Sequence, residues 1–441
     1  MFAIATTHYN KGAAKILEEY LSGTSDYTPE VIASFVDALE QHFVNFHLNT
    51  PPAGYYYRIR GRVSLNYLQS KINGGTLAMG AITDASGNIN DAVAATSVFY
   101  AVDGNADGAT NILSFNTGRY IQAVTEGGKV VFKEDNLPLD DAAYYSQDVL
   151  IHPSRTDSDG YYAWAFGGNN YLCDNITNAT TAKNVEISAG NSANRKYDWS
   201  IELVTELPVE VSAAKMTSLC VPVELEIPDG VTAYILTGKE IADGNHLYAV
   251  DYETYTPGTE VFNVEQIGCG IIPAGMPVLI KADEGVHYFP INYDAKDADK
   301  DDAMLEEIAD LEARNRLEGT HDARLVSERA GIQHHILSKK NGKVGMFKVK
   351  MVSAAERGLS YVSTPTFINQ AHRAWLPYSA AASASGFAFA IGGKGHDTTD
   401  IDGVTVEREE NDAIYDLQGR RLEGITSPGF YVVNGKKIIV K

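Results

Sequence analysis

"NYLQS" at residues 66–70 is the first of three related stretches, and "RYIQA" at 119–123 and "NYLCD" at 170–174 follow it 53 and 51 residues later. A second pattern keeps nearly the same step. SVFYAV from Ser97, QDVLIH from Gln147 and YDWSIE from Tyr197 are spaced by 50 and 50 residues. Two separate anchors with one period indicate an internal repeat of three units between residues 55 and 204.

Each unit reads as four short strands: an opening strand, the "YL" strand, a strand such as VVF or VEI, and the closing strand. Three such units can close on themselves and leave no open strand edge. Four strands repeated three times is the pattern of a β-trefoil. The sequence therefore predicts a β-trefoil over 51–205.

The first fifty residues have a different, helical pattern. Thr28-Pro29 is typical of a helix start, and Val31, Phe35, Leu39 and Phe43 then recur every four residues. We expect a short N-terminal helical segment over 1–50.

The region after the repeat is rich in longer strands. Pro-Asp-Gly at 228–230 and Pro-Ala-Gly at 273–275 predict tight turns. Longer strands separated by such turns favour a two-sheet β-sandwich over 206–395. A helix is predicted at about 300–315, with Leu305, Ile308 and Leu311 on one face. The acids Asp297, Asp299, Asp301 and Asp302 precede or open that helix, where they favour the positive helix end and call for no metal.

A polar, glycine-rich linker, GGKGHDTTDIDG at 392–403, precedes the last segment. There Asn434-Gly435 lies between FYVV and KKIIV and predicts a two-residue hairpin turn. We expect a small C-terminal β domain over 400–441. The whole chain is thus predicted to be mainly β.

Composition limits the partners. The 441-residue chain has a net charge of −21 and an isoelectric point near 4.9. A surface that binds nucleic acid or anionic lipid has to neutralise phosphate with Lys and Arg, so neither partner is expected. No run of about 18 apolar residues is present, which predicts no membrane span.

The three cysteines match no zinc or redox pattern. We expect Cys173, Cys220 and Cys269 to be buried free thiols, with a Cys220–Cys269 disulfide as the alternative.

Catalytic motifs are missing from the sequence. There is no HExxH, no GxSxG, and no P-loop serine or threonine after the Gly-Lys at 393–394. Paired carboxylates of a glycosidase would leave no such motif. We predict a protein that is not an enzyme and has no cofactor. The alternative is a part of a secreted hydrolase.

Asp103, Asn105, Asp107 and Gly108 copy the beginning of a calcium-binding loop, D-x-N-x-D-G. Position twelve of such a loop is a glutamate, and here it is Ser114. The other interpretation is a polar loop between two units of the repeat.

Residues 55–204 resemble ricin-type β-trefoil lectins through the "YL" and closing strands. In that family a unit can hold a sugar with an acid after the "YL" strand, a polar side chain and an aromatic platform on the next strand, and an asparagine before the closing QxW. The resemblance places these roles in the third unit on Asp174, Glu186 and Asn194. Ser188 stands where the platform belongs, and YDW at 197–199 keeps only the tryptophan.

The end of the chain, AIYDLQGRRLEGITSPGFYVVNGKKIIVK, resembles the C-terminal (type IX-like) sorting domain of secreted, multi-modular Bacteroidota proteins. IIPAGMPVLIKA at 271–282 resembles the β-sandwich modules that precede such tails. This resemblance implies a secreted or cell-surface protein whose last domain is recognised by an export or anchoring machine.

The predicted function is weak, multivalent binding of a glycan or glycoprotein by the trefoil, in a carbohydrate-binding accessory region. Two alternatives stay open. One is a portion of a secreted glycoside hydrolase or peptidase whose catalytic domain lies elsewhere, and the other is a structural spacer or adhesin.

Overall fold

The computed structural model describes much of the chain from residue 53 to residue 391, and four short strand segments nearer its end. The predicted helical segment at 1–50 and the linker at 392–403 lie outside the described residues. Those residues are 53–70, 77–84, 86–106, 109–126, 129–134, 137–139, 148–153, 161–166, 170–174, 183–184, 186–189, 195–241, 260–293, 295, 300–340, 342–379, 386–391, 414–416, 421–422, 429–433 and 436–440.

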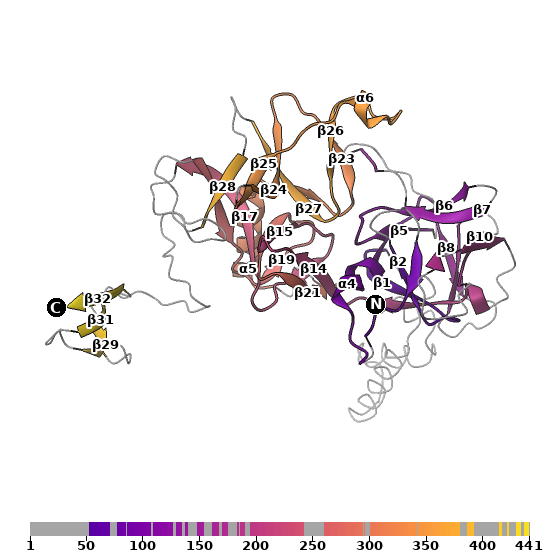
Figure 1. The fold of residues 1–441 in the computed structure, drawn as a ribbon, viewed down its shortest axis with the longest axis horizontal. Helices are drawn as coiled ribbons and strands as arrows, with labels where there is room; N and C mark the ends of the chain where they lie inside the picture. Colours follow the sequence, from indigo (N-terminus) through magenta and orange to yellow (C-terminus); the bar gives the residue numbers. More distant parts are fainter. Residues whose placement is uncertain are drawn as a thin grey trace, which may run out of the picture. The chain divides into compact units, whose positions relative to one another are not determined.

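Six strands of the repeat region form a closed antiparallel ring (Figure 1, indigo to magenta). In ring order they are β1 (Tyr56–Gly61), β4 (Phe99–Asp103), β5 (Thr110–Ser114), β8 (Leu150–Pro153), β9 (Tyr162–Ala165) and β13 (Trp199–Leu203), which pairs again with β1. β5 meets β8 at one bridge, where Thr110 and Val149 exchange N–H···O bonds of 3.0 and 2.8 Å. The ring has no free edge along its circumference.

Each unit adds a hairpin to the ring. The hairpins are β2 (Tyr67–Gln69) with β3 (Ala78–Gly80), β6 (Ile121–Glu126) with β7 (Lys129–Glu134), and β10 (Asn170–Cys173) with β12 (Glu186–Ala189); the short β11 (Lys183–Asn184) pairs with β3. Short helices α4 (Asp91–Ala94), η1 (Ala95–Ser97) and η2 (Arg195–Tyr197) precede closing strands.

The strand register repeats with the sequence. The "YL" tyrosines Tyr67, Tyr120 and Tyr171 pair with Arg60, Leu113 and Ala165 of the three opening strands. At the other end of those strands, Phe99, Val149 and Trp199 pair with Tyr57, Thr110 and Tyr162. The same pairing recurs at each step of about fifty residues, so the β-trefoil predicted from the repeat is confirmed.

Large side chains fill the ring. Trp199 and Trp164 are almost fully buried among Tyr57, Ile59 and Leu172, and the Trp199 indole N–H donates to the Leu172 carbonyl at 3.1 Å. The regular step of the repeat therefore brings the closing-strand residues Phe99, Val149 and Trp199 into the same core.

Two sheets follow the trefoil. The first consists of β14 (Glu206–Val211), β21 (Gly285–Asn292), β16 (Glu224–Glu226) and β19 (Ile271–Ile272). The second has nine strands, in the order β15 (Met216–Leu219), β20 (Val278–Lys281), β17 (Thr232–Ile241), β18 (Glu260–Gln266), β28 (Gly386–Ile391), β25 (Lys343–Lys348), β24 (Gln333–Lys340), β27 (Arg373–Tyr378) and β22 (Glu318–Thr320). A two-stranded sheet joins β23 (Arg324–Ser327) to β26 (Thr366–Asn369), and α6 (Ala354–Arg357) lies between these strands in sequence.

The first sheet packs against one face of β15, β20 and β17, which forms the predicted sandwich. Ile235 and Ile280 point into this layer. Their neighbours Leu236 and Leu279 point the other way, into a core that the far strands of the same nine-stranded sheet complete with residues such as Met346. The long sheet therefore curls over itself, as strongly twisted sheets of this width do. This second core is a feature that a simple two-sheet sandwich lacks.

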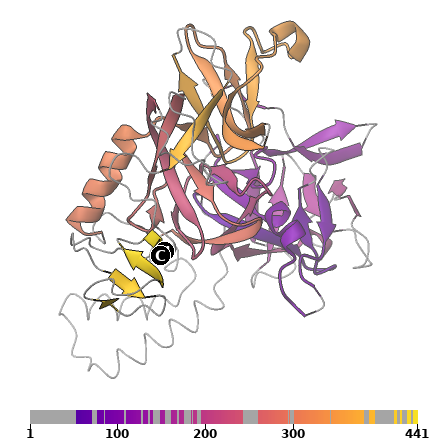
Figure 2. The same cartoon turned by 60° about the vertical axis from the view of Figure 1, so that its left-hand side comes forward.

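The helix α5 (Asp302–Arg314) lies beside β17 (Figures 1 and 2). The Asp301 carboxylate caps it by accepting from the Met304 N–H at 2.8 Å, which agrees with the predicted role of acids at this helix start. Leu311 is buried, whereas Leu305 and Ile308 are half-buried.

The trefoil and the sandwich share one hydrophobic core. Tyr56, Tyr100 and Phe115 from the trefoil pack with residues of the sandwich that include Leu207 and Phe289. The backbone joins β13 to β14 through only two residues, and residues up to Gly393 form one compact unit.

Lys394–Lys441 form a second unit. Its four strands are β29 (Ile414–Asp416), β30 (Arg421–Leu422), β31 (Gly429–Val433) and β32 (Lys436–Val440), in the sheet order β30–β29–β31–β32. Val433 pairs with Lys436, so two residues join β31 to β32 as the Asn434-Gly435 hairpin predicts.

All three cysteines are free thiols, as expected. Cys173 and Cys220 are buried, Cys269 is half-buried, and the alternative disulfide is absent. Among the described residues, no helix is long and apolar enough to cross a membrane.

Candidate functional site

The third unit contains the sugar-binding residues that the sequence predicts, and its acid, Asp174, is buried. Only 1% of its surface is exposed. One carboxylate oxygen accepts from both the backbone N–H and the hydroxyl of Ser64, each at 2.8 Å. Gly61 makes room for this contact, because a Cβ there would lie 2.3 Å from the same oxygen. Asp174 therefore joins the third unit to the loop that follows β1 of the first unit.

This loop is held in an unusual conformation. Leu65 has a φ of 58° in the left-handed region, although its side chain is 57% exposed and not fixed by packing. Backbone bonds of Leu65 N–H to Gly61 and of Gly61 N–H to Asn66 close the turn at 3.0 and 2.9 Å. The Asp174 carboxylate on Ser64 supplies the contact that keeps the turn in place.

The other two predicted residues are less fully described. Glu186 opens β12, where its backbone pairs with Cys173 of β10, and Asn194 lies outside the described residues. A sugar pocket built from Asp174, Glu186 and Asn194 stays a prediction.

The seam between the first and third units also contains a buried ion pair. Arg62 and the fully buried Asp198 are 2.8 Å apart, and the Arg62 guanidinium lies over the Tyr161 ring at 4.2 Å. Sequence reasoning missed this pair, although Asp198 is the central residue of the YDW motif. Removing either partner would take a charge–charge contact away from the other at a poorly solvated position.

Three equivalent outer faces of the trefoil differ sharply in chemistry. The first-unit face, as we name it, consists of Arg58 and Arg60 on β1, Tyr67 on β2 and Glu202 on β13. These side chains alternate with the buried Tyr57 and Ile59 and so point outward. Arg58 is directly opposite Glu202, and Arg60 directly opposite Tyr67.

Contacts tie the first-unit face together. The Tyr67 hydroxyl lies 3.0 and 3.1 Å from the two Glu202 oxygens and donates its proton to this carboxylate. The Arg60 guanidinium lies 5.4 Å from the centre of the Tyr67 ring. All four side chains are half-buried. The result is an aromatic ring, a carboxylate and two guanidinium groups gathered on one solvent-facing surface.

Electrostatics keep these groups in defined charge states. Burial, together with the Glu202 carboxylate, raises the pKa of Tyr67 to about 12, so its hydroxyl stays protonated at neutral pH. Burial lowers the pKa of Arg58, but an arginine remains charged.

The corresponding second-unit face is covered. Val102, Leu113 and Tyr120 occupy the positions of Glu202, Arg60 and Tyr67, and they pack in the core shared with the sandwich. On the third-unit face, His152 lies edge-on to Tyr171 with ring centres 5.8 Å apart, and Tyr171 is only 6% exposed. Among these three faces, the first presents a polar aromatic surface.

The calcium-like loop is held by Asp148, a residue outside the D-x-N-x-D-G pattern. The Asp148 carboxylate accepts from the backbone N–H groups of Asn105 and Ala106 at 2.8 and 2.9 Å. Asp103 precedes this turn, and Asp107 lies outside the described residues. Within the described part of the chain, no three His, Cys, Asp or Glu side chains converge as a metal site. The calcium interpretation of this loop stays the alternative to a polar loop.

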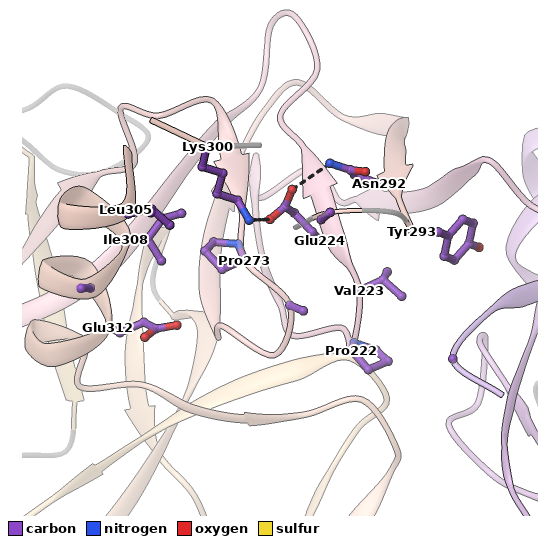
Figure 3. Close-up of a pocket in the computed structure, with 14 residues that line it drawn as sticks. Pro222, Val223, Glu224, Pro273, Asn292, Tyr293, Lys300, Leu305, Ile308 and Glu312 are labelled. Carbon is purple, nitrogen blue, oxygen red and sulfur yellow. Dashed lines mark hydrogen bonds and ion pairs between the residues drawn. The ribbon is translucent and has the colours of Figure 1, made fainter. Parts of the chain in front are cut away.

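A pocket of about 490 Å³ lies beside α5 (Figure 3). Leu305 and Ile308 form its apolar wall. At its base, Glu224 accepts from Lys300 at 3.0 Å and from the Asn292 amide at 3.0 Å. Both Glu224 oxygens are thus engaged, so the charge of this carboxylate is compensated within the pocket.

No protein-family model and no curated protein matches the sequence. Several solved structures resemble part of the chain. A GlcNAcα1-4Gal-releasing endo-β-galactosidase from Clostridium perfringens is 16% identical over 34% of this chain and 33% of its own, with a TM-score of 0.27. This chain therefore spans about a third of that enzyme.

Two smaller proteins align over nearly their whole length. The β-trefoil named BEL is 17% identical, over 35% of this chain and 97% of its own, with a TM-score of 0.27. The Macrolepiota procera ricin B-like lectin, solved in complex with lactose, is 12% identical, over 34% of this chain and 96% of its own, with a TM-score of 0.26.

Proposed function

We propose that this protein is a non-catalytic carbohydrate-binding region that binds glycans through its β-trefoil and acts outside the cell. The observation that carries this proposal is the first-unit face. Sugars are bound by aromatic rings that contact their C–H groups and by carboxylate and guanidinium groups that bond their hydroxyls. The half-buried side chains of Tyr67, Glu202, Arg58 and Arg60 place all of these on one solvent-facing surface.

Asp174 contributes to the same surface indirectly in this proposal. Its carboxylate holds Ser64, and the carbonyl of the next residue, Leu65, accepts from the Arg60 Nε–H at 3.0 Å. Asp174 is therefore proposed as a positioning residue for Arg60. The roles of Glu186 and Asn194 as sugar ligands remain part of the proposal for the third unit.

Binding by one such face would be weak, because the surface is shallow and its polar groups are partly solvated. Several copies on a cell surface would raise the effective affinity through avidity. The second part of the proposal is that an export or anchoring machine of a Bacteroidota-type secretion route recognises the C-terminal unit. Display on a cell surface by such a route would provide the several copies that avidity requires.

A glycan array with the full chain tests the proposal. The expected result is binding to at least one class of sugar, with Tyr67→Ala reducing it by about tenfold or more because the aromatic contact is lost. Tyr67→Phe is the matched variant, since it keeps the ring and removes only the hydroxyl. Silence on every sugar would favour the structural spacer instead.

Asp174→Ala tests the positioning role. It should weaken glycan binding at the first-unit face without abolishing it, because Asp174 acts on that face only through the loop and Arg60. Undiminished binding by a folded Asp174→Ala protein would remove Asp174 from the site.

A further inference from the structure

Each arginine of the first-unit face is held by a hydrogen bond from its own Nε–H group. The Arg58 Nε–H donates to the Ser97 hydroxyl at 3.2 Å, and the Arg60 Nε–H donates to the Leu65 carbonyl at 3.0 Å. Among the described residues, the terminal NH₂ groups of these two guanidinium groups make no hydrogen bond. The direction of each guanidinium group is thus fixed, while its two terminal NH₂ groups stay available to a ligand.

The local charge on this face is opposite to that of the chain. Arg58 and Arg60 carry two positive charges against the one negative charge of Glu202, in a protein whose net charge is −21. Glu202 is engaged by the Tyr67 hydroxyl, so it satisfies neither arginine by a direct hydrogen bond. A half-buried guanidinium without a bonded anion gains most from a ligand that brings one.

We infer that the first-unit face binds acidic saccharides, with the sugar carboxylate on the Arg58 and Arg60 forks and the sugar ring against Tyr67. Arginine is suited to this role, because its planar fork forms two parallel N–H···O bonds with a carboxylate. This inference rests on the proposed function and specifies the class of sugar.

The repeat supplies an internal comparison. The positions of Arg58 and Arg60 are occupied by Asn111 and Leu113 in the second unit and by Ala163 and Ala165 in the third. Neither of the other faces can form the double guanidinium contact. The acidic-sugar site is therefore expected once per chain.

Titration of the full chain with three matched oligosaccharides tests the inference: one ending in glucuronate, its neutral glucose counterpart, and a sulfated counterpart. We expect the carboxylated sugar to bind at least about tenfold more tightly than the neutral one. Its affinity should fall as salt is added, because the contact is ionic.

The variant Arg58→Gln/Arg60→Gln should lose about tenfold or more of its affinity for the carboxylated sugar. Its affinity for the neutral sugar should fall much less, because only hydroxyl contacts are lost there and the Gln amides can replace part of them. Arg316→Gln is the control, since it removes one charge from an exposed arginine outside the trefoil and should change neither. Arg60→Lys keeps the positive charge but lacks the planar guanidinium group, so its affinity for the carboxylated sugar should fall several-fold. This milder variant keeps the test valid if the double variant does not fold.

Equal affinity for the carboxylated and neutral sugars would overturn the inference and leave the proposed function standing. So would preference for the sulfated sugar, or a double variant that binds the carboxylated sugar normally. A chain that binds no sugar at all would overturn both.

Discussion

The first-unit and second-unit faces of the trefoil occupy equivalent places in the same repeat, but one is open and the other is covered by the sandwich. At matching positions the open face has Arg60, Tyr67 and Glu202, and the covered face has Leu113, Tyr120 and Val102. The backbone register is the same in both. The difference teaches that the repeat determines the fold, whereas a few outward side chains decide whether a face stays open or packs against a neighbouring domain.

The covered face should account for the largest stability effect. Phe115 packs in the shared core and stacks on His372 with ring centres 4.1 Å apart. Phe115→Ala should lower the free energy of unfolding by about 3–5 kcal/mol, because it leaves a cavity in that core. Urea denaturation measures the change.

The control for this variant is Leu150→Ala, whose side chain is 51% exposed on the third-unit face, and it should change stability by less than about 0.5 kcal/mol. A loss below about 1 kcal/mol for Phe115→Ala would show that the covered face does not hold the two regions together.

The second-largest loss of stability is expected from acid, which protonates a histidine beside the covered face. His372 is buried with its Nε2–H donating to the Phe115 carbonyl at 2.7 Å, and burial lowers its pKa to about 3. The neutral ring therefore stabilises the fold fully above pH 6.5, and this contribution, about 5 kcal/mol, is lost as the pH falls from 6.5 to 3.

His372→Asn should flatten this pH dependence. Asn tolerates the left-handed backbone of this position, where φ is 55°, and does not titrate. Comparing the urea midpoints of both proteins at pH 7, 5 and 4 isolates the histidine from the carboxylates. Parallel pH profiles would contradict the assignment.

A smaller effect is expected at the seam beneath the open face. Gly61→Ala places a methyl group against the Asp174 carboxylate and should cost about 1–3 kcal/mol through overpacking. Gly238→Ala is the matched control, because nothing lies within 4 Å of its Cβ position. Equal effects of the two substitutions on thermal unfolding would show that the Gly61 contact is not tight.

The open face should give the smallest stability effect. Tyr67→Phe removes one partly solvated hydrogen bond, which is worth about 0.5–1.5 kcal/mol at most. Because the pKa of Tyr67 is raised to about 12, its neutral form stabilises the fold fully below pH 10, and this contribution is lost between pH 10 and 12. Tyr67→Phe should lack that alkaline component, and urea midpoints at pH 9 and 11.5 would reveal whether it does.

The sequence predicted the trefoil because the anchors at Tyr67 and Trp199 repeat at a fixed step, and each step corresponds to one strand pairing. It assigned Asp174 to a sugar pocket, which stays a prediction, and it did not predict the burial of Asp174, since the partner Ser64 lies 110 residues away in sequence. The open face was missed. Its signal was present in YYRIRG at 56–61, where Arg58 and Arg60 alternate with core residues.

The covering of the second unit could not be predicted. Leu113 and Val102 have the composition of ordinary core residues, and nothing in their own unit distinguishes packing inside the trefoil from packing against the next domain. Such long-range contacts depend on the whole topology rather than on local pattern.

The broad junction between trefoil and sandwich also has a mechanical meaning. The two regions are joined by a packed core and by backbone bonds such as Ala323 N–H to Gly118 and Leu325 N–H to Pro138, of 2.8 and 2.7 Å, in addition to the two-residue connection. A pulling force on the sandwich would be distributed over that whole surface. Under the proposed function, a sugar on the open face would thus be held by a trefoil that is packed firmly on the next domain rather than attached by a flexible linker.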